Sequence, residues 1–185
     1  MGFTATLPLM AVASIAIVLD DPEDGPLYSQ IRIGRNGRKF RMYKLRTMRK
    51  DADKELHKLS HLNEADGPAF KIKDDPRVTR IGKFLRKSCI DELPQLWNVM
   101  QGSMSLVGPR PPLPKEVEKY ESWQMKRLSV TPGITCYWQI MQDRNDVPFN
   151  DWVRMDLKYV EDASLATDFS ILLKTVGCVL KLSGR

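Results

Sequence analysis

The sequence predicts one α-rich α/β domain with a small, irregular β part, preceded by an apolar helix. An apolar share of 42% beside 28% charged residues is typical of a chain of 185 residues with a buried core. Helical periodicity covers most of the chain, whereas clear strand alternation with an Asn-Gly turn is confined to 30–48. We therefore divide the chain into an N-terminal apolar segment, 1–22, and a domain, 23–185.

The N-terminal apolar segment is short for a membrane span. Phe3 to Leu19 is 17 residues without a charge. As one helix it would measure roughly 25 Å, against a hydrocarbon core of about 30 Å. Pro8 removes a helical hydrogen bond, so we expect the helix to break there. Three interpretations remain: a signal peptide, which the start without Lys or Arg disfavours; a buried core helix; and a helix that enters one leaflet or lies in the interface.

The net charge of +6 comes from one window of the chain. Gly25 to Lys50 holds nine Lys and Arg and no Asp or Glu. Beside an apolar segment, such a window is expected to bind anionic lipid headgroups on the cytoplasmic side. Because Phe40 and Tyr43 interleave with the cations, a nucleic-acid-binding module is a second interpretation.

The remaining elements follow from periodicity and turn residues. The turn at Asn36-Gly37 predicts a β-hairpin, and a proline-rich turn is expected from Pro109 to Pro114. We expect an extended aromatic stretch over Val130–Asp146. The segments expected to be helical are Asp51–Ala65, Lys83–Gln101 with a break before Asp91, Pro114–Ser129, Val147–Glu161 and Asp168–Leu182.

Cysteine and histidine provide no sign of a disulfide framework or a zinc site. Cys89, Cys136 and Cys178 are widely spaced and odd in number, which fits a reducing, cytosolic setting. His57 and His61 lie four apart, but no third ligand stands at a suitable spacing, so we do not expect a metal there.

The stretch "SCIDELPQL" from Ser88 to Leu96 has two interpretations. In the structural one, Ser88 caps a helix whose first turn holds Asp91, Glu92 and Pro94. In the chemical one, Asp91 is a nucleophile toward phosphorus beside a second carboxylate. Two such carboxylates resist joint ionisation unless a cation is present, and Mg²⁺ takes carboxylate and phosphate oxygens together.

Basic residues elsewhere would complete a phosphate clamp. Arginine binds phosphate in a bidentate manner. Arg110 is held between Pro109 and Pro111, so its backbone is rigid. The other candidates are Lys44, Arg46 and Arg86.

The run "RKSCIDELPQLWNVMQGSMSLVGPRP", Arg86 to Pro111, closely resembles the bacterial sugar transferase family, the monotopic phosphoglycosyl transferases. The resemblance covers nearly the whole chain. The other segments that carry it are the leading apolar segment with its proline, Gly25–Met48, Val130–Ile140 and Arg144–Val176.

The resemblance implies a role for each matching residue. Asp91 matches the nucleophilic aspartate, which would also contact the metal, and Glu92 matches its partner. Pro8 matches the proline that turns a re-entrant membrane helix back to its own side. The residues that match positions near the phosphates are Lys44, Arg46, Arg86 and Arg110. Those that fall in the segment associated with the nucleotide-sugar pocket are Arg144, Asp156 and Tyr159.

The resemblance also implies a reaction and a location. It would be transfer of a sugar phosphate from a UDP-sugar to undecaprenyl phosphate, with Mg²⁺, through a sugar-phosphoryl-aspartate in a ping-pong mechanism. Residues 23–185 would then form a catalytic domain on the cytoplasmic face of the bacterial inner membrane, contacting anionic lipids and no nucleic acid. Galactose, glucose and N-acetylated sugars are all compatible. The alternative is a basic peripheral-membrane or nucleic-acid-binding module without catalysis.

Overall fold

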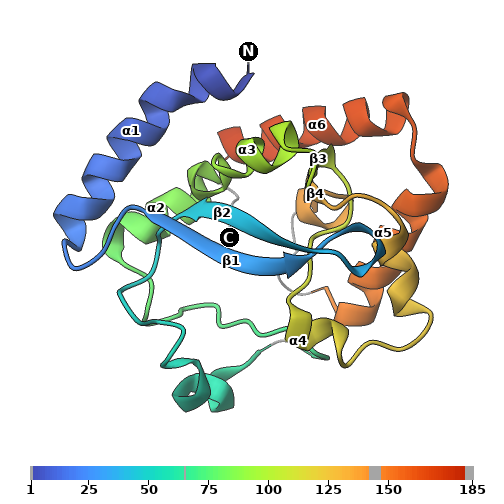
Figure 1. Cartoon of the computed structure of the whole chain (residues 1–185), viewed down its shortest axis with the longest axis horizontal. Coiled ribbons are helices and arrows are strands. Elements are labelled where there is room, and N and C mark those ends of the chain that lie inside the picture. The colour runs from blue at the N-terminus through green and yellow to red at the C-terminus, as the bar shows by residue number, and fades with distance from the viewer. Residues whose placement is uncertain (1, 65, 142–146, 182–185) are drawn as a thin grey trace.

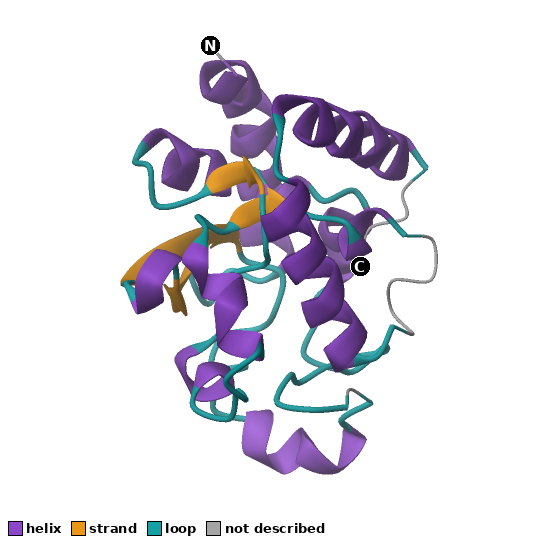
Figure 2. Cartoon of the chain, turned by 90° about the vertical axis from the view of Figure 1, so that its right-hand side faces the viewer, coloured by secondary structure: helices purple, strands orange, loops and turns teal. Residues whose placement is uncertain are grey.

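The fold combines helices with a two-stranded hairpin whose strands are partly exposed. The computed structural model describes residues 2–64, 66–141 and 147–181 (Figure 1). The strands are β1 (Leu27–Ile33), β2 (Lys39–Leu45), β3 (Ser105–Val107) and β4 (Gly133–Thr135). The α-helices are α1 (Gly2–Asp20), α2 (Arg80–Lys87), α3 (Gln95–Met100), α4 (Pro114–Val117), α5 (Phe149–Asp162) and α6 (Leu165–Leu180). Helix thus dominates over a small β part, as predicted (Figure 2).

The predicted hairpin is confirmed. β1 and β2 pair antiparallel from Leu27 opposite Leu45 to Ile33 opposite Lys39. Asn36 and Gly37 both adopt positive φ, at 55° and 77°, which this residue pair tolerates better than others. Since the side chains alternate between faces, Met42 and Lys44 point to the same side of β2.

β3 and β4 form a short parallel pair that holds the proline-rich turn. Ser105 lies opposite Gly133, and the Gly133 amide donates to the Pro109 carbonyl over 3.0 Å. A Cβ on Gly133 would lie 2.1 Å from the Gly108 nitrogen, so only glycine permits this close approach. The backbone on either side of Arg110 is therefore held by a neighbouring strand.

The N-terminal helix does not break at Pro8, which corrects the expectation from sequence. α1 is one helix from Gly2 to Asp20 with Pro8 inside it. A proline removes one hydrogen bond and crowds the preceding turn, and the remaining turns are sufficient to continue the helix. Among the described residues, no helix combines the length and apolar character that crossing a membrane requires.

α1 packs on the domain through its C-terminal half. Ala13 and Ile17 are buried with Leu45 of β2 and Leu85 of α2. A second core joins α5 and α6, where Tyr159 and Ile171 pack on Val107 of β3. The predicted helices at α5 and α6 are confirmed, with Ser164 as the N-cap of α6.

Three expected elements are shorter than the sequence indicated. Within 51–64 the structure has turns and a 3₁₀ helix, Leu56–Leu62, and the Ala52 carbonyl accepts from both the Glu55 amide and the Arg77 guanidinium. The expected helix 114–129 is divided into α4 and the 3₁₀ helix η4 (Gln124–Ser129), since the Gln124 side chain accepts from the Glu121 amide and starts a new turn. Within 130–141, β4 is a strand and Trp138–Ile140 is a 3₁₀ helix, whereas 142–146 lie outside the described residues.

α2 makes a second close backbone contact. Thr79 caps this helix, and its own amide donates to the Thr47 carbonyl after β2. A Cβ on Gly82 would lie 2.1 Å from the Thr47 oxygen. Glycine at 82 therefore allows α2 to lie directly on the chain that leaves β2.

We predict that Gly82→Ala lowers the free energy of unfolding by about 1–3 kcal/mol, because the added methyl group overlaps backbone that cannot rotate away. Urea unfolding followed by circular dichroism measures the change. Gly177→Ala is the matched control, since it also replaces a helical glycine but no atom lies within 4 Å of its added Cβ. The control is expected to be neutral or to stabilise by about 0.5–1 kcal/mol. Equal effects of the two variants would contradict the prediction.

Candidate functional site

The two carboxylates Asp91 and Glu92 lie on a tight turn between two helices. α2 ends at Lys87, Cys89 adopts a left-handed conformation with φ 57°, and Ile90–Glu92 forms the 3₁₀ turn η3. The predicted break before Asp91 is confirmed. The capping role of Ser88 is wrong: its hydroxyl donates back to the Phe84 carbonyl of α2 over 2.9 Å, because the left-handed Cys89 separates it from the next turn.

Asp91 is buried beside a lysine from β2. Its side chain is only 10% exposed, and Lys44 Nζ lies 4.0 Å from its Oδ2 and 2.7 Å from Glu92 Oε1. Burial, with a smaller contribution from Glu92, raises the pKa of Asp91 to about 6 against the opposing effects of Lys44 and Arg86. Asp91 therefore changes protonation just below neutral pH, as a group active at neutral pH requires.

The strand that carries Lys44 is tied to the helix that follows the two carboxylates. Asn98 of α3 is 1% exposed; its Oδ1 accepts from the Tyr43 amide at 3.1 Å, and its Nδ2 donates to the Arg41 carbonyl at 2.7 Å. The side chain thus occupies the edge of β2 as a further strand would. This fixes the distance between Lys44 and the turn that holds Asp91.

Two of the predicted arginines, Arg86 and Arg110, line the same cavity as the two carboxylates. Arg86 of α2 donates to Thr47 Oγ1 at 2.9 Å, and burial lowers its pKa, while Asp91 opposes that shift. Arg110 stands on the turn after β3. Its guanidinium makes no hydrogen bond or ion pair with the described part of the chain, so it is available to a ligand.

These side chains line one cavity of about 590 Å³. Asp91 and Glu92 lie in its wall with Lys44, Arg86 and Arg110, so the structure brings these five of the predicted site residues to one cavity. A cavity of this size suits a small organic ligand. Another part of its wall is aromatic and contains Tyr120, Trp138, Phe149 and Trp152.

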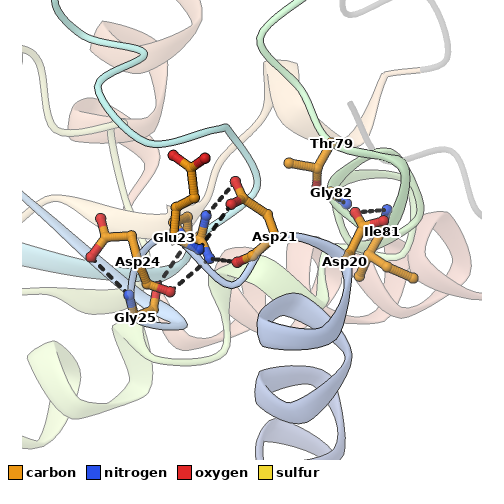
Figure 3. A network of polar contacts seen from close by, with 9 residues as sticks. Asp20, Asp21, Glu23, Asp24, Gly25, Thr79, Ile81 and Gly82 are labelled. Atoms are coloured by element: carbon orange, nitrogen blue, oxygen red, sulfur yellow. Dashed lines mark hydrogen bonds and ion pairs between the residues drawn. The ribbon is translucent and has the colours of Figure 1, made fainter.

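Arg46 also lines the cavity, but its guanidinium is committed to the junction between α1 and β1. It forms an ion pair with Asp21 at 2.7 Å and donates to the carbonyl oxygens of Asp21, Asp24 and Gly25. Figure 3 shows this network beside Asp20, whose carboxylate accepts from the Ile81 amide of α2. The structure therefore gives Arg46 the task of holding α1, and does not bring it to the two carboxylates.

The three residues expected in a nucleotide-sugar pocket have different positions. Asp156 is 1% exposed below the cavity and pairs with Arg127, which does line it. Burial raises the pKa of Asp156 to about 6, against the opposing effect of Arg127. Tyr159 lies in the core, where its hydroxyl donates to Asp168 over 2.8 Å, and Arg144 lies outside the described residues.

Sequence reasoning missed two buried arginines of the cavity wall. Arg127 pairs with Asp156, 29 residues away, and no local pattern signals this contact. Arg32 of β1 is 8% exposed and donates to the Pro111 carbonyl at 3.0 Å. Alternation with Gln30 could have placed Arg32 on the inner face. The basic window is thus not one exposed patch, because Arg32 and Arg46 are buried.

The described residues do not form a metal site made of protein ligands alone. Within 2–64, 66–141 and 147–181, no group of three or more His, Cys, Asp or Glu side chains could hold an ion. His57 and His61 form no such group either. Asp91 and Glu92 would have to share a cation with a bound ligand. The arrangement therefore combines a buried carboxylate of raised pKa with available cations, which suits chemistry at a phosphate group.

Comparison with known proteins gives a consistent match. A family model described as "Bacterial sugar transferase" matches residues 1–182. The chain is 47% identical over 185 residues to the galactosyl transferase CpsE of Streptococcus agalactiae, covering 99% of this chain and 41% of the relative. It is 42% identical over 190 residues to the UDP-galactose-lipid carrier transferase of Erwinia amylovora, covering 100% of this chain and 40% of the relative.

A third relative is the undecaprenyl-phosphate galactose phosphotransferase of Salmonella typhimurium. The identity is 42% over 168 residues, which cover 88% of this chain and 35% of the relative. The chain spans less than half the length of these three relatives.

We predict that Lys44→Met raises the pKa of Asp91 above its value of about 6, by about 1 or more, because Lys44 is the strongest influence that lowers it. Carbon-13 NMR titration of the aspartate carboxyls measures this directly. The Asp91 carboxyl binds its proton more tightly in the folded protein than in the unfolded chain. Its contribution to the free energy of unfolding is therefore lost as pH rises from about 3.8 to about 6. In Lys44→Met the free energy of unfolding should continue to fall to higher pH, because the Asp91 pKa is higher.

Lys39→Met is the matched control, since Lys39 begins the same strand and is exposed. It removes the same charge and should leave the Asp91 titration unchanged. An Asp91 pKa that stays the same in Lys44→Met would show that Lys44 does not govern this carboxyl.

Proposed function

Because the chain belongs to the bacterial sugar transferase family, we propose that it transfers a sugar phosphate from a UDP-sugar to undecaprenyl phosphate. The observation that carries the proposal is the cavity, which contains a buried carboxylate between Lys44 and Arg86 and an uncommitted Arg110. The names of two relatives support a UDP-galactose donor and an undecaprenyl-phosphate acceptor for those proteins. The whole protein would carry out the first membrane step of polysaccharide or glycoconjugate assembly.

The reaction proceeds by two exchanges at one phosphorus atom. A carboxylate oxygen of Asp91 attacks the β-phosphate of the UDP-sugar, and the bond between that phosphorus and the bridging oxygen breaks. UMP leaves, and the sugar phosphate remains on Asp91 as an acyl phosphate. A phosphate oxygen of undecaprenyl phosphate then attacks the same phosphorus, which releases the Asp91 carboxylate and gives undecaprenyl-diphosphate-sugar.

The side chains around Asp91 have complementary tasks in this scheme. Burial makes the carboxylate a stronger base and nucleophile than in water, and Lys44 keeps enough of it ionised near neutral pH. Glu92, 2.7 Å from Lys44 Nζ, accepts a proton from the acceptor phosphate if it arrives protonated. Arg86 and Arg110 balance the charge of the transferred phosphate, so positioning and charge stabilisation account for most of the rate.

Mg²⁺ is the cofactor we propose for this site. Mg²⁺ is usually held by one or two carboxylates together with substrate phosphates, and Asp91 with Glu92 fits that donor set. Asp91 is the ligand we assign. When bound, the ion neutralises diphosphate charge and reduces the repulsion between the two acids.

We place the domain on the cytoplasmic face of the bacterial inner membrane, where anionic lipids surround the acceptor. α6 exposes one apolar face, with Phe169 at 64%, Leu173 at 58% and Val176 at 56%. Figure 1 shows α1, α3 and α6 along its upper edge, and Trp97, Met100 and several apolar side chains of α1 are exposed as well. Exposed apolar side chains on these helices suit contact with the interface of a bilayer.

We predict that Leu173→Gln with Val176→Gln weakens binding to vesicles of anionic phospholipid by about 10-fold or more, because two apolar side chains are lost from the lipid-facing surface. Co-sedimentation with the vesicles measures the affinity. Met125→Gln, on η4, is the control for losing an exposed apolar side chain elsewhere. If the double variant and the control bind equally well, α6 does not face the lipid.

We predict that Asp91→Asn reduces UMP release from UDP-sugar in the presence of undecaprenyl phosphate by at least about 1,000-fold, because the nucleophile is lost. The assay uses the detergent-solubilised protein and a panel of UDP-sugars. Wild-type protein given labelled UDP-sugar without acceptor should retain labelled sugar phosphate, and Asp91→Asn should retain none.

Asp151→Asn is the control, since Asp151 lies on the surface in a pair with Arg154 and lines no part of the cavity. It should keep the wild-type rate. In the same assay, removal of Mg²⁺ by a chelator should stop turnover, and added Mg²⁺ should restore it. Near-normal turnover of Asp91→Asn would refute the nucleophile assignment, and turnover in chelator would refute the cofactor assignment.

A further inference from the structure

Arg32 is a buried cation of the cavity wall without a paired carboxylate. Its side chain donates to the Pro111 carbonyl at 3.0 Å and to Gln30 Oε1 at 2.8 Å, both uncharged acceptors. It forms no ion pair with any acid in the described ranges. A buried charge is costly when nothing of opposite sign offsets it.

The acids that act on Arg32 are already engaged. Glu116 accepts from the Leu113 amide at 2.8 Å, and Glu92 pairs with Lys44. Burial lowers the pKa of Arg32 to about 10, and the charge of Arg110 is the next contribution in the same direction. Two guanidinium groups therefore repel each other at one wall of the cavity.

Arg32 also holds the turn on which Arg110 stands. Besides its bond to Pro111, the neighbouring Ile33 amide donates to the Pro112 carbonyl at 2.9 Å. β1 thus fixes the two residues directly after Arg110. The Arg110 guanidinium, which makes no bond of its own to the described residues, is presented from a backbone held on this side by β1 and on the other by β4.

We propose that Arg32 and Arg110 form a two-arginine site for a phosphate group, in which Arg32 positions Arg110 and supplies a second positive charge. The bound oxyanion is the missing counter-charge of the pair. Guanidinium groups suit this task because they remain charged when buried and bind phosphate oxygens. The inference rests on the proposed function for its ligands: the phosphate belongs either to the diphosphate of the donor or to the monophosphate of the lipid acceptor.

The test measures binding without turnover. We expect Arg32→Met to weaken the affinity for pyrophosphate and UDP, or for undecaprenyl phosphate in detergent, by about 10- to 100-fold, the effect of losing a charge-assisted contact. Calorimetry measures the affinity for the soluble anions, and tryptophan fluorescence measures the affinity for the lipid. Weaker binding of UDP assigns the site to the donor, and weaker binding of the lipid assigns it to the acceptor. Unchanged binding of both overturns the inference.

Arg41→Met is the matched control, because Arg41 is an exposed arginine on the same hairpin and does not line the cavity. It removes the same charge and should leave every affinity within about twofold of wild type. If Arg32→Met does not fold, Arg32→Lys keeps the charge but cannot hold Pro111 and Gln30 together, and it should still weaken binding about 10-fold.

A double-variant cycle separates this role from general destabilisation. Since Arg32 acts together with Arg110, the double variant should bind the anion less than about 3-fold more weakly than Arg110→Met alone. Fully additive losses would overturn the pairing. The two proposals fail on different results. Wild-type protein that releases no UMP from any UDP-sugar in the presence of undecaprenyl phosphate would refute the proposed function, whereas only unchanged or additive anion affinities refute the Arg32 and Arg110 pair.

Discussion

A buried carboxylate requires a cation beside it, and the contact of Lys44 with Asp91 and Glu92 meets that requirement here. The contact joins β2 to the turn between α2 and α3, two parts of the chain 48 residues apart. Several other features hold these parts at a fixed separation. Asn98 binds the edge of β2 from α3, and Gly82 lets α2 lie on Thr47 at the end of the strand.

The C-terminal end of β2 is therefore connected both to the two carboxylates and to the end of α1. Lys44 lies near the end of β2, and Arg46 directly follows the strand. Lys44 reaches the carboxylates, whereas Arg46 holds the chain that leaves α1. The orientation of the N-terminal helix and the position of Lys44 depend on the same short strand. In the function that we propose, this rigid connection would help one substrate from water and another from lipid to meet at the same carboxylate.

The charges of the cavity are not balanced by the protein alone. Arg110 has no partner among the described residues, and Arg32 is buried against uncharged acceptors. A stable fold tolerates this because the surrounding backbone is held by β1 and β4. The resulting positive potential is available to an anionic ligand, and it stands opposite the carboxylate that we propose to react.

The sequence by itself determined the features that depend on near neighbours. The Asn-Gly turn specified the hairpin, apolar periodicity specified α5 and α6, and the ordered motifs identified the family. The sequence did not show whether Ser88 begins the helix that follows it or ends the helix that precedes it. The left-handed backbone at Cys89 decides this, since it leaves the Ser88 hydroxyl bonded to the preceding helix. Pro8 likewise proved compatible with a continuous α1.

Only the tertiary structure decided which charged side chains face the cavity and which hold the fold. Arg46 resembled a phosphate ligand in the sequence. In the structure, all three nitrogens of its guanidinium donate to Asp21, Asp24 and Gly25 at the junction with α1. Tyr159 proved to be a core residue, and Arg32 proved to be part of the site through a contact with Pro111, 79 residues away. A charged side chain has the same local pattern in either role. Its partner is chosen by packing between distant segments, and local sequence does not contain that information.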